Sequence, residues 1–435
     1  MTTVRERVAL RPEATAPVAA RAVRVEEITT PLGVRAHLIN EPALPFLSLA
    51  LHFRGGAAAD PADRPGLAYL GTGLLDEGAG PYDSMAFRRE LEDHAIRLGF
   101  DADRDGVSGE MKTLTAHREH AFELLRLALT EPRFDEEPVA RVRGQIAAEL
   151  RRLEAEPNYL ASRAWFERAF PGHPYGRPTR GTPESLAAIG RDDLVEFAHR
   201  RLGRDSLVVG VAGDITADAL APLLDHAFGG LAATAERPEV PTTAPRTGGT
   251  GIVRLPNPQS VVTFGGAGLP RLDPDYYAAY VANYILGGGG FSSRLTEEIR
   301  EKRGLAYSVY SYLFDLDHAP IWIGSVATKN EQVAQSLRLI RQELGRLAAG
   351  EVEDQDLLDA KTYLTGSFAL RLTSNDQVAK TLVAMLDQGL GRDYLDRRNP
   401  LIEAVTLGDV RRVSARLYAE DILVTIAGAP EGVEG

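Results

Sequence analysis

Alternation and helical periodicity of apolar positions divide the first part of the chain into short strands and amphipathic helices. In residues 46–54, FLSLALHFR, apolar and polar residues alternate, which predicts a strand. Two further strands are expected just before it, at residues 23–30 and 33–40. A helix is expected from Gly66 to Leu75, and Asp83 and Ser84 provide cap residues for a second helix through residues 85–99.

Residues 100–114 predict a hairpin with its turn at Asp105 and Gly106. Two long amphipathic helices follow, at residues 118–132 and 136–156. In the second helix, apolar residues share one face: Val139, Val142, Ile146, Leu150 and Leu153. The largely apolar segment 206–215 predicts a buried strand that closes this half.

The same order of elements returns in the second half of the chain. Strands are expected within 252–269, a helix ending in glycines at 275–290, a second helix at 292–304 and a strand at 305–315. Paired helices at 332–350 and 354–372 and a closing strand at 421–429 complete the series. Corresponding elements lie about 210–220 residues apart, which indicates duplication of one α+β domain.

The predicted fold class is therefore α+β, with two homologous domains that each carry an antiparallel sheet covered by helices on one face. We divide the chain into an N-terminal tail (1–22), a first domain (23–230), a linker (231–251) and a second domain (252–435). The linker is assigned because that segment is rich in Pro, Thr, Ala and Gly and has no hydrophobic period. The cleft between the domains is the default binding site.

Composition narrows the possible functions. With 49 Lys and Arg against 61 Asp and Glu, the net charge is −12, which argues against nucleic-acid binding. The chain has no cysteine, which excludes disulfides and thiolate chemistry. No apolar run approaches the ~20 residues that span a bilayer, and the N-terminus has no signal-peptide core. We expect a cytoplasmic protein, or a periplasmic one if a leader was removed.

Four stretches resemble the pitrilysin/insulinase family of zinc peptidases, the inverzincins, over nearly the whole chain. These stretches are PGLAYLGTGLLDEG, GHPYGRPTRGTPESL, ILGGGGFSSRL and EIREKRGLAYSVYS. The size and the paired halves are similar to the processing-peptidase branch, in which two subunits form the working unit. The resemblance implies a clam-shell half that encloses a peptide cavity.

In that family an H-x-x-E-H helix supplies two zinc ligands and a general base, and a later glutamate is the third ligand. The histidine positions correspond here to Tyr69 and Gly73, and the base position to Thr72. Only the third ligand remains, as Glu149. One carboxylate cannot hold zinc in a three-ligand site, so we expect no metal at this position and no cofactor in this chain.

The family also carries an arginine and a tyrosine seven residues apart, which bind the scissile peptide and stabilise the oxyanion. These positions correspond to Arg300 and Tyr307. A guanidinium and a phenol are suitable donors to a developing negative charge. The alternative is that Arg300 makes a surface ion pair and Tyr307 only fills a strand.

Four consecutive glycines, Gly287, Gly288, Gly289 and Gly290, precede this pair. The resemblance implies a flexible loop that lines the cleft and holds substrate. The other interpretation is a helix C-cap that needs a positive φ. A phosphate loop is not expected, because no Lys-Ser/Thr follows the glycines.

Two other motifs imitate metal sites. His117 and His120 share a helical face, but their spacing is one residue short of the zincin motif, so a solvated polar face is expected. Residues 101–106, DADRDG, open like a calcium loop but have Lys112 at the twelfth position, so a hairpin turn is expected instead.

Together these features predict a zinc-less subunit of a heterodimeric peptidase. A homologous partner with an intact H-x-x-E-H would carry the zinc, and a peptide would be the substrate. The resemblance implies one of two peptidase functions: general peptide degradation, or trimming of a small precursor peptide such as that of pyrroloquinoline quinone. The alternatives are a structural subunit without proteolytic role and a protein that binds peptides without cleaving them.

Overall fold

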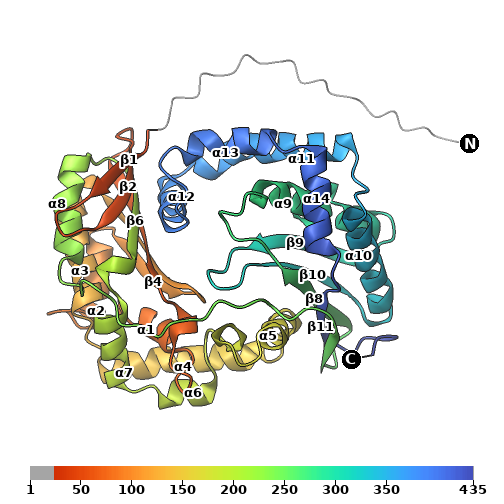
Figure 1. Cartoon of the computed structure of the whole chain (residues 1–435). Coiled ribbons are helices and arrows are strands. Elements are labelled where there is room, and N and C mark those ends of the chain that lie inside the picture. Colours follow the sequence, from red (N-terminus) through yellow and green to blue (C-terminus); the bar gives the residue numbers. More distant parts are fainter. Residues whose placement is uncertain (1–23, 435) are drawn as a thin grey trace, which may run out of the picture.

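Two mixed β-sheets, one in each half of the chain, lie on either side of the molecular centre (Figure 1). The structure is a computed structural model, and it describes residues 24–434. The expected tail, residues 1–22, lies outside the described residues. Helices cover the outer side of both sheets and join the two halves (Figure 1).

The first sheet has the strand order β1-β2-β6-β3-β5-β4. The strands are β1 (Glu26–Thr29), β2 (Arg35–Asn40), β3 (Phe46–Arg54), β4 (Arg97–Ala102), β5 (Gly106–Leu114) and β6 (Leu207–Gly213). β2 and β6 run parallel, whereas the other neighbouring strands are antiparallel. The hairpin of β4 and β5 confirms the turn expected at Asp105, since the Asp103 carboxylate accepts hydrogen bonds from the backbone of Asp105 and Gly106.

The second sheet repeats this arrangement with the order β7-β11-β8-β10-β9. The strands are β7 (Thr250–Arg254), β8 (Gln259–Ala267), β9 (Ala306–Phe314), β10 (Ile321–Lys329) and β11 (Leu423–Gly428). Here β7 and β11 are the parallel pair. β7 begins at Thr250, inside the segment expected as a linker. β9 and β4 occupy equivalent places, each as the edge strand next to an antiparallel neighbour.

Helices of both halves fall into similar positions in the sequence. The first half contains α1 (Leu67–Thr72), α2 (Ser84–Asp93), α3 (Arg118–Thr130), α4 (Glu136–Leu153), α5 (Pro157–Ala169), α6 (Pro183–Ala188), α7 (Arg191–Glu196) and α8 (Ala217–Phe228). The second half contains α9 (Tyr276–Asn283), α10 (Val333–Ala348), α11 (Asp354–Gly366), α12 (Asn375–Asp387), α13 (Tyr394–Glu403) and α14 (Leu407–Tyr418).

Each half gives one helix to the sheet of the other half. α5 packs on β11 and β8 of the second sheet, and α12 packs on β6 and β3 of the first sheet (Figure 1). The side chain of Trp165 on α5 is fully buried and donates a hydrogen bond to the carbonyl of Leu423 at 3.1 Å. In return, the α12 backbone approaches Gly210 of β6 so closely that a Cβ there would lie 2.2 Å from the Ala379 oxygen. The two halves therefore share their buried surfaces.

The expected α+β class and the two homologous halves are confirmed, with two corrections of detail. Each sheet contains one parallel pair, because the closing strand enters the sheet between a parallel and an antiparallel neighbour. The sheets are also not covered on one face only, because α5 and α12 cover part of the other face. This double cover explains why every residue of β6 and β11 is buried.

Candidate functional site

The helix that corresponds to the family's metal-binding helix is α1, and its N-terminus is held by Asp60. The Asp60 carboxylate accepts hydrogen bonds from the backbone amides of Gly66 (2.9 Å) and Ala68 (3.1 Å). Gly66 has a φ of 92°, a conformation that glycine adopts without strain. Arg201 completes the support by pairing with Asp60 at 2.7 Å in a buried site. The scaffold for a site on α1 is therefore intact.

The side chains on α1 do not fit a metal. Thr72, at the base position, is 1% exposed, and its hydroxyl donates to the carbonyl oxygen of Ala68 at 2.9 Å. Gly73, at the second histidine position, has no side chain. Tyr69, at the first histidine position, has a phenol whose pKa is raised, chiefly by burial. None of the three supplies the imidazole or carboxylate ligands that zinc requires.

Glu149 on α4, the residue expected to remain from the family's ligand set, is paired with an arginine. Arg180 Nη1 lies 2.8 Å from Glu149 Oε1, and the Arg180 guanidinium lies over the Tyr69 ring at 5.1 Å from its centroid. A protein cation thus neutralises the carboxylate that would otherwise face a metal. Glu149 is therefore already paired, and the α1 side chains place no imidazole or carboxylate beside it; the loss of the zinc site stays a prediction.

Arg300 and Tyr307 lie side by side in the second half. Arg300 belongs to the π-helical turn at Thr296–Glu301, and Tyr307 belongs to the edge strand β9. The Arg300 guanidinium lies over two aromatic rings, 4.6 Å from the centroid of Phe291 and 5.3 Å from that of Tyr307. Its ion pair is with the adjacent Glu301, at 3.4 Å. The sequence spacing thus corresponds to a real cluster, here called the Arg300 cluster: Phe291, Arg300 and Tyr307.

A β-bulge presents Tyr307 to solvent. Val309 pairs with Val326 and Ala306 with Thr328, so one residue of β10 faces both Tyr307 and Ser308. Bulges of this kind re-aim side chains at strand edges. Tyr307 is 85% exposed as a result. Its phenol is therefore accessible to a ligand or to another chain.

Sequence reasoning missed the aromatic residues beside this pair. Phe291 is exposed and contacts Arg300, and further along β9 the exposed residues are Tyr310, Tyr312 and Phe314. The rings of Tyr310 and Tyr312 stack with their centroids 6.0 Å apart. The sequence contains a pattern that identifies these aromatic residues: alternation within residues 305–315 places Tyr310, Tyr312 and Phe314 on one face of the strand.

The four glycines form tight turns rather than an open loop. A Cβ on Gly287, Gly288 or Gly289 would lie within 3.0 Å of atoms of Ser311, Asn283 or Tyr284, respectively. Gly290 has a φ of 57° with free space around its Cα, and it leads directly into Phe291. The first three positions thus reflect close packing, and the fourth matches the positive φ that a cap residue needs.

A cavity of about 280 Å³ lies between the two halves. Its lining includes Tyr69 and Arg180 of the first half, and Phe314 and Asp317 of the second. Arg300 and Tyr307 are not among its lining residues. Tyr307 and Phe314 are seven positions apart along the extended strand β9, a span of roughly 20 Å. The structure therefore does not bring the Arg300 cluster to the vacated metal position of the same chain.

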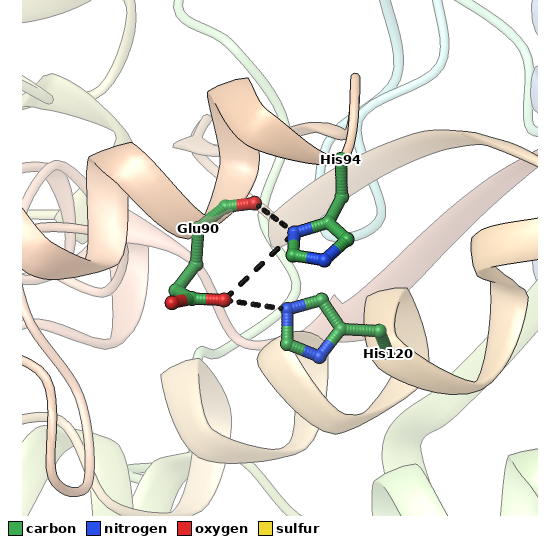
Figure 2. Close-up of side chains that lie close together, drawn as sticks. All are labelled: Glu90, His94 and His120. Atoms are coloured by element: carbon green, nitrogen blue, oxygen red, sulfur yellow. Dashed lines mark hydrogen bonds and ion pairs between the residues drawn. The ribbon is translucent and has the colours of Figure 1, made fainter.

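The expectation for His117 and His120 is wrong in part. His120 is half-buried, and its Nε2 lies 3.0 Å from Glu90 Oε2, while the ring of His94 lies against it (Figure 2). The correction has a simple cause: α2 packs beside α3 and supplies these partners from another helix. For residues 101–106, the structure confirms the hairpin turn.

Among residues 24–434, no helix has the length and apolar character needed to cross a membrane.

Comparison with known proteins agrees with this architecture. Residues 35–183 match the family described as Insulinase (Peptidase family M16), and residues 188–364 match the one described as Peptidase M16 inactive domain. A Helicobacter pylori protein named Non-peptidase homolog YmxG is 30% identical over 331 residues, which cover 75% of this chain and 76% of that protein.

Two solved structures show the same fold. The crystal structure of a peptidase M16 inactive domain from Pseudomonas fluorescens superposes with a TM-score of 0.88 at 26% identity, covering 94% of this chain and 99% of that chain. A chain of Complex III2 from Candida albicans superposes with a TM-score of 0.79 at 19% identity, covering 94% and 97%. At that identity the second likeness concerns the fold alone.

Proposed function

Because this chain belongs to the insulinase family of peptidases (peptidase family M16) and lacks its zinc ligands, we propose that it is the zinc-less subunit of a two-chain peptidase. It is an inactive member of the family by itself, since α1 carries neither metal ligands nor a general base. A homologous partner with an intact H-x-x-E-H helix would hold the zinc and the base. This chain would contribute the Arg300 cluster and part of the chamber wall.

The observation that carries the proposal is the contrast between the two half-sites. At the vacated position, Arg180 and Glu149 neutralise each other. In the Arg300 cluster, by contrast, the phenol of Tyr307 is exposed, and the guanidinium of Arg300 lies over two rings with only the adjacent, solvent-exposed Glu301 as an ion-pair partner among the described residues, at 3.4 Å. Preorganised donors of this kind stabilise an oxyanion without reorganising during the reaction.

The distance of the Arg300 cluster from Tyr69 also favours action on a second chain. Within one chain the two half-sites do not line a common cavity. A partner related by pseudo-twofold symmetry would present its own metal helix to β9. The free edge of β9 would pair with an extended peptide by β-augmentation, and its exposed tyrosines would contact alternate side chains.

Peptide cleavage by the reconstituted pair tests the proposal. We expect the chain alone to be inactive and the complex to cleave. Arg300→Ala or Tyr307→Phe should lower turnover by roughly 10–1000-fold, the scale of losing an oxyanion donor. Arg303→Ala is the matched control, because Arg303 lies three residues away and pairs with Glu298 at 2.6 Å. Full activity of both Arg300 and Tyr307 variants would refute the assignment.

A structural role is the second candidate, and the fold shared with a chain of Complex III2 favours it. On that view the chain would assemble with other subunits without any cleavage, and the Arg300 and Tyr307 variants would assemble normally. A neighbouring gene for a similar-length chain with intact H-x-x-E-H favours the peptidase pair instead. Peptide affinity of the isolated chain would favour a third role, capture without cleavage.

We propose that the substrate is a short, extended peptide in the cytoplasm. It would be either a degradation intermediate or a small precursor peptide such as that of pyrroloquinoline quinone. The support is the cavity between the two halves and the free edges of β4 and β9, which offer unpaired backbone groups to an extended chain. Mass spectrometry of the products released by the reconstituted pair from a peptide library would identify the preferred sequence.

A further inference from the structure

Two imidazoles and a carboxylate converge between α2 and α3, in the helical layer of the first half (Figure 2). Glu90 lies in the last turn of α2, His94 is its C-cap residue, and His120 lies in the first turn of α3. One ligand atom from each residue lies within 4.8 Å of the other two. All three side chains are half-buried.

The distances suit a first-row transition metal. Two ligands of a tetrahedral zinc ion, each about 2.0–2.2 Å from the metal, lie about 3.3–3.5 Å apart. Glu90 Oε2 lies 3.0 Å from His120 Nε2 and 3.8 Å from His94 Nδ1, which brackets this value. The ligand atoms of His94 and His120 lie within 4.8 Å of each other, so rotation of the two side chains toward Glu90 would place all three on one ion.

The elements that hold these ligands are well anchored. Glu90 and His94 are four residues apart on one face of α2, and the N-terminus of α2 is capped by Asp83. α3 packs against α8 in the buried core. The ring of His117 lies edge-on to that of His94, with centroids 5.3 Å apart, and forms a wall of the site.

We propose that Glu90, His94 and His120 bind one Zn²⁺ ion, with water in the remaining coordination position. Two imidazoles and one carboxylate favour Zn²⁺ over Mg²⁺ or Ca²⁺, which prefer all-oxygen sites. This site is separate from the vacated family position on α1. The sequence alone predicted no metal in this chain. By joining α2 to α3, the ion stabilises the helical layer behind the first sheet.

Binding changes the hydrogen bonding of His94. Without metal, Nδ1 of His94 lies 2.9 Å from the carbonyl oxygen of Glu90, so it donates its proton there. As a ligand, this nitrogen must present its lone pair, and the ring proton then resides on Nε2.

Equilibrium dialysis of the tag-free full chain against Zn²⁺, with metal analysis by mass spectrometry, tests the site. We expect one zinc per chain. His94→Ala, His120→Ala and Glu90→Gln should each weaken binding at least ~10-fold. Co²⁺ in place of zinc should give the visible absorption bands of a four-coordinate ion, which provides a readout on the wild-type chain even if a variant fails to fold.

Two controls locate the ion. His226→Ala removes a surface histidine that also pairs with a carboxylate, Glu123 at 2.7 Å, but has no third ligand. Glu149→Gln alters the vacated family position. Both variants should bind zinc like the wild type. Absence of zinc and of the Co²⁺ bands from the wild type would overturn the proposal, as would loss of zinc in Glu149→Gln with retention in His120→Ala. Because no peptide or partner is needed, failure here leaves the proposed function untouched.

Discussion

At the scale of single residues, two arginines pair with the carboxylates that lie around α1. Arg180 neutralises Glu149 at the vacated position, and Arg201 neutralises Asp60 beneath the same helix. The second pair is the more deeply buried, and Arg201 also donates to the carbonyl oxygens of Gly55 and Gly56. Its hydrogen bonds make Asp60 the residue on which the position of α1 depends.

Asp60→Ala is therefore expected to destabilise the fold. The substitution leaves the Arg201 charge buried without its partner and removes two hydrogen bonds from the first turn of α1. Breaking a buried pair in this way costs about 3–5 kcal/mol of unfolding free energy. Urea unfolding followed by circular dichroism measures the change. The control is Asp63→Ala, which removes an exposed carboxylate three residues after Asp60 and should change the unfolding free energy little. Equal stability of the two variants would contradict this account.

At the scale of elements, the exchanged helices depend on small residues in the opposite sheet. Gly210 is the clearest case, because the Ala379 carbonyl, the Leu382 Cβ and the Val383 nitrogen would all lie within 3.0 Å of an added Cβ. Two of these three atoms belong to the α12 backbone, so the contact cannot be relieved by rotating a side chain.

Gly210→Ala should thus move α12 away from β6 and lower the unfolding free energy by about 1–3 kcal/mol. Gly144→Ala serves as the control, because nothing lies within 4 Å of a Cβ at that position of α4. Alanine is preferred over glycine in a helix interior, so the control should be neutral or slightly stabilising. Differential scanning calorimetry would compare the two, and a stabilised Gly210 variant would contradict the tight packing.

Local patterns predicted the elements but not their exchange. Alternation in β3 and the apolar stripe of α4 are local properties, and the duplication repeats them, so the α+β class followed from the sequence. Which sheet receives α5 or α12 depends on contacts between residues far apart in the sequence, such as Trp165 with Leu423, which are 258 positions apart. No local period encodes that choice.

The site was predictable to a similar extent. The spacing of Arg300 and Tyr307 within a family motif identified the pair, but the contribution of Phe291 emerges only where Gly290 turns the chain. The prediction for His117 and His120 rests on the pattern along their own segment. Glu90 and His94 lie on a different helix, and a pattern along one helix carries no information about its neighbour.

At the scale of the whole molecule, the two halves are connected by hydrogen bonds at the hairpin turns of both sheets. Asp105, in the turn between β4 and β5, accepts a hydrogen bond from the backbone amide of Asp317, in the turn between β9 and β10, at 3.2 Å. The Tyr175 hydroxyl donates to Asp105 and accepts from the His318 amide. Burial raises the pKa of Asp105 from 3.8 to about 6, so this connection responds to pH.

A raised pKa in the folded state means that folding favours protonated Asp105. Its contribution to stability is present below pH 3.8 and is lost as the pH rises through about 6. Asp105→Asn removes this titration. Between pH 4 and 7, the variant should therefore gain stability relative to the wild type, on the order of 1–3 kcal/mol. Chemical denaturation across that pH range measures the difference, and parallel curves for the two proteins would contradict it.

The pairing of Arg180 with Glu149 makes reversion to an active enzyme difficult. Reinstating histidines at Tyr69 and Gly73 and a glutamate at Thr72 would return every absent group, yet the incoming ion would meet a resident guanidinium of like charge. Arg180 would have to be replaced as well, and until then the three restored groups would confer no advantage. Restoring a metal site at this position thus requires four coordinated substitutions, at Tyr69, Thr72, Gly73 and Arg180.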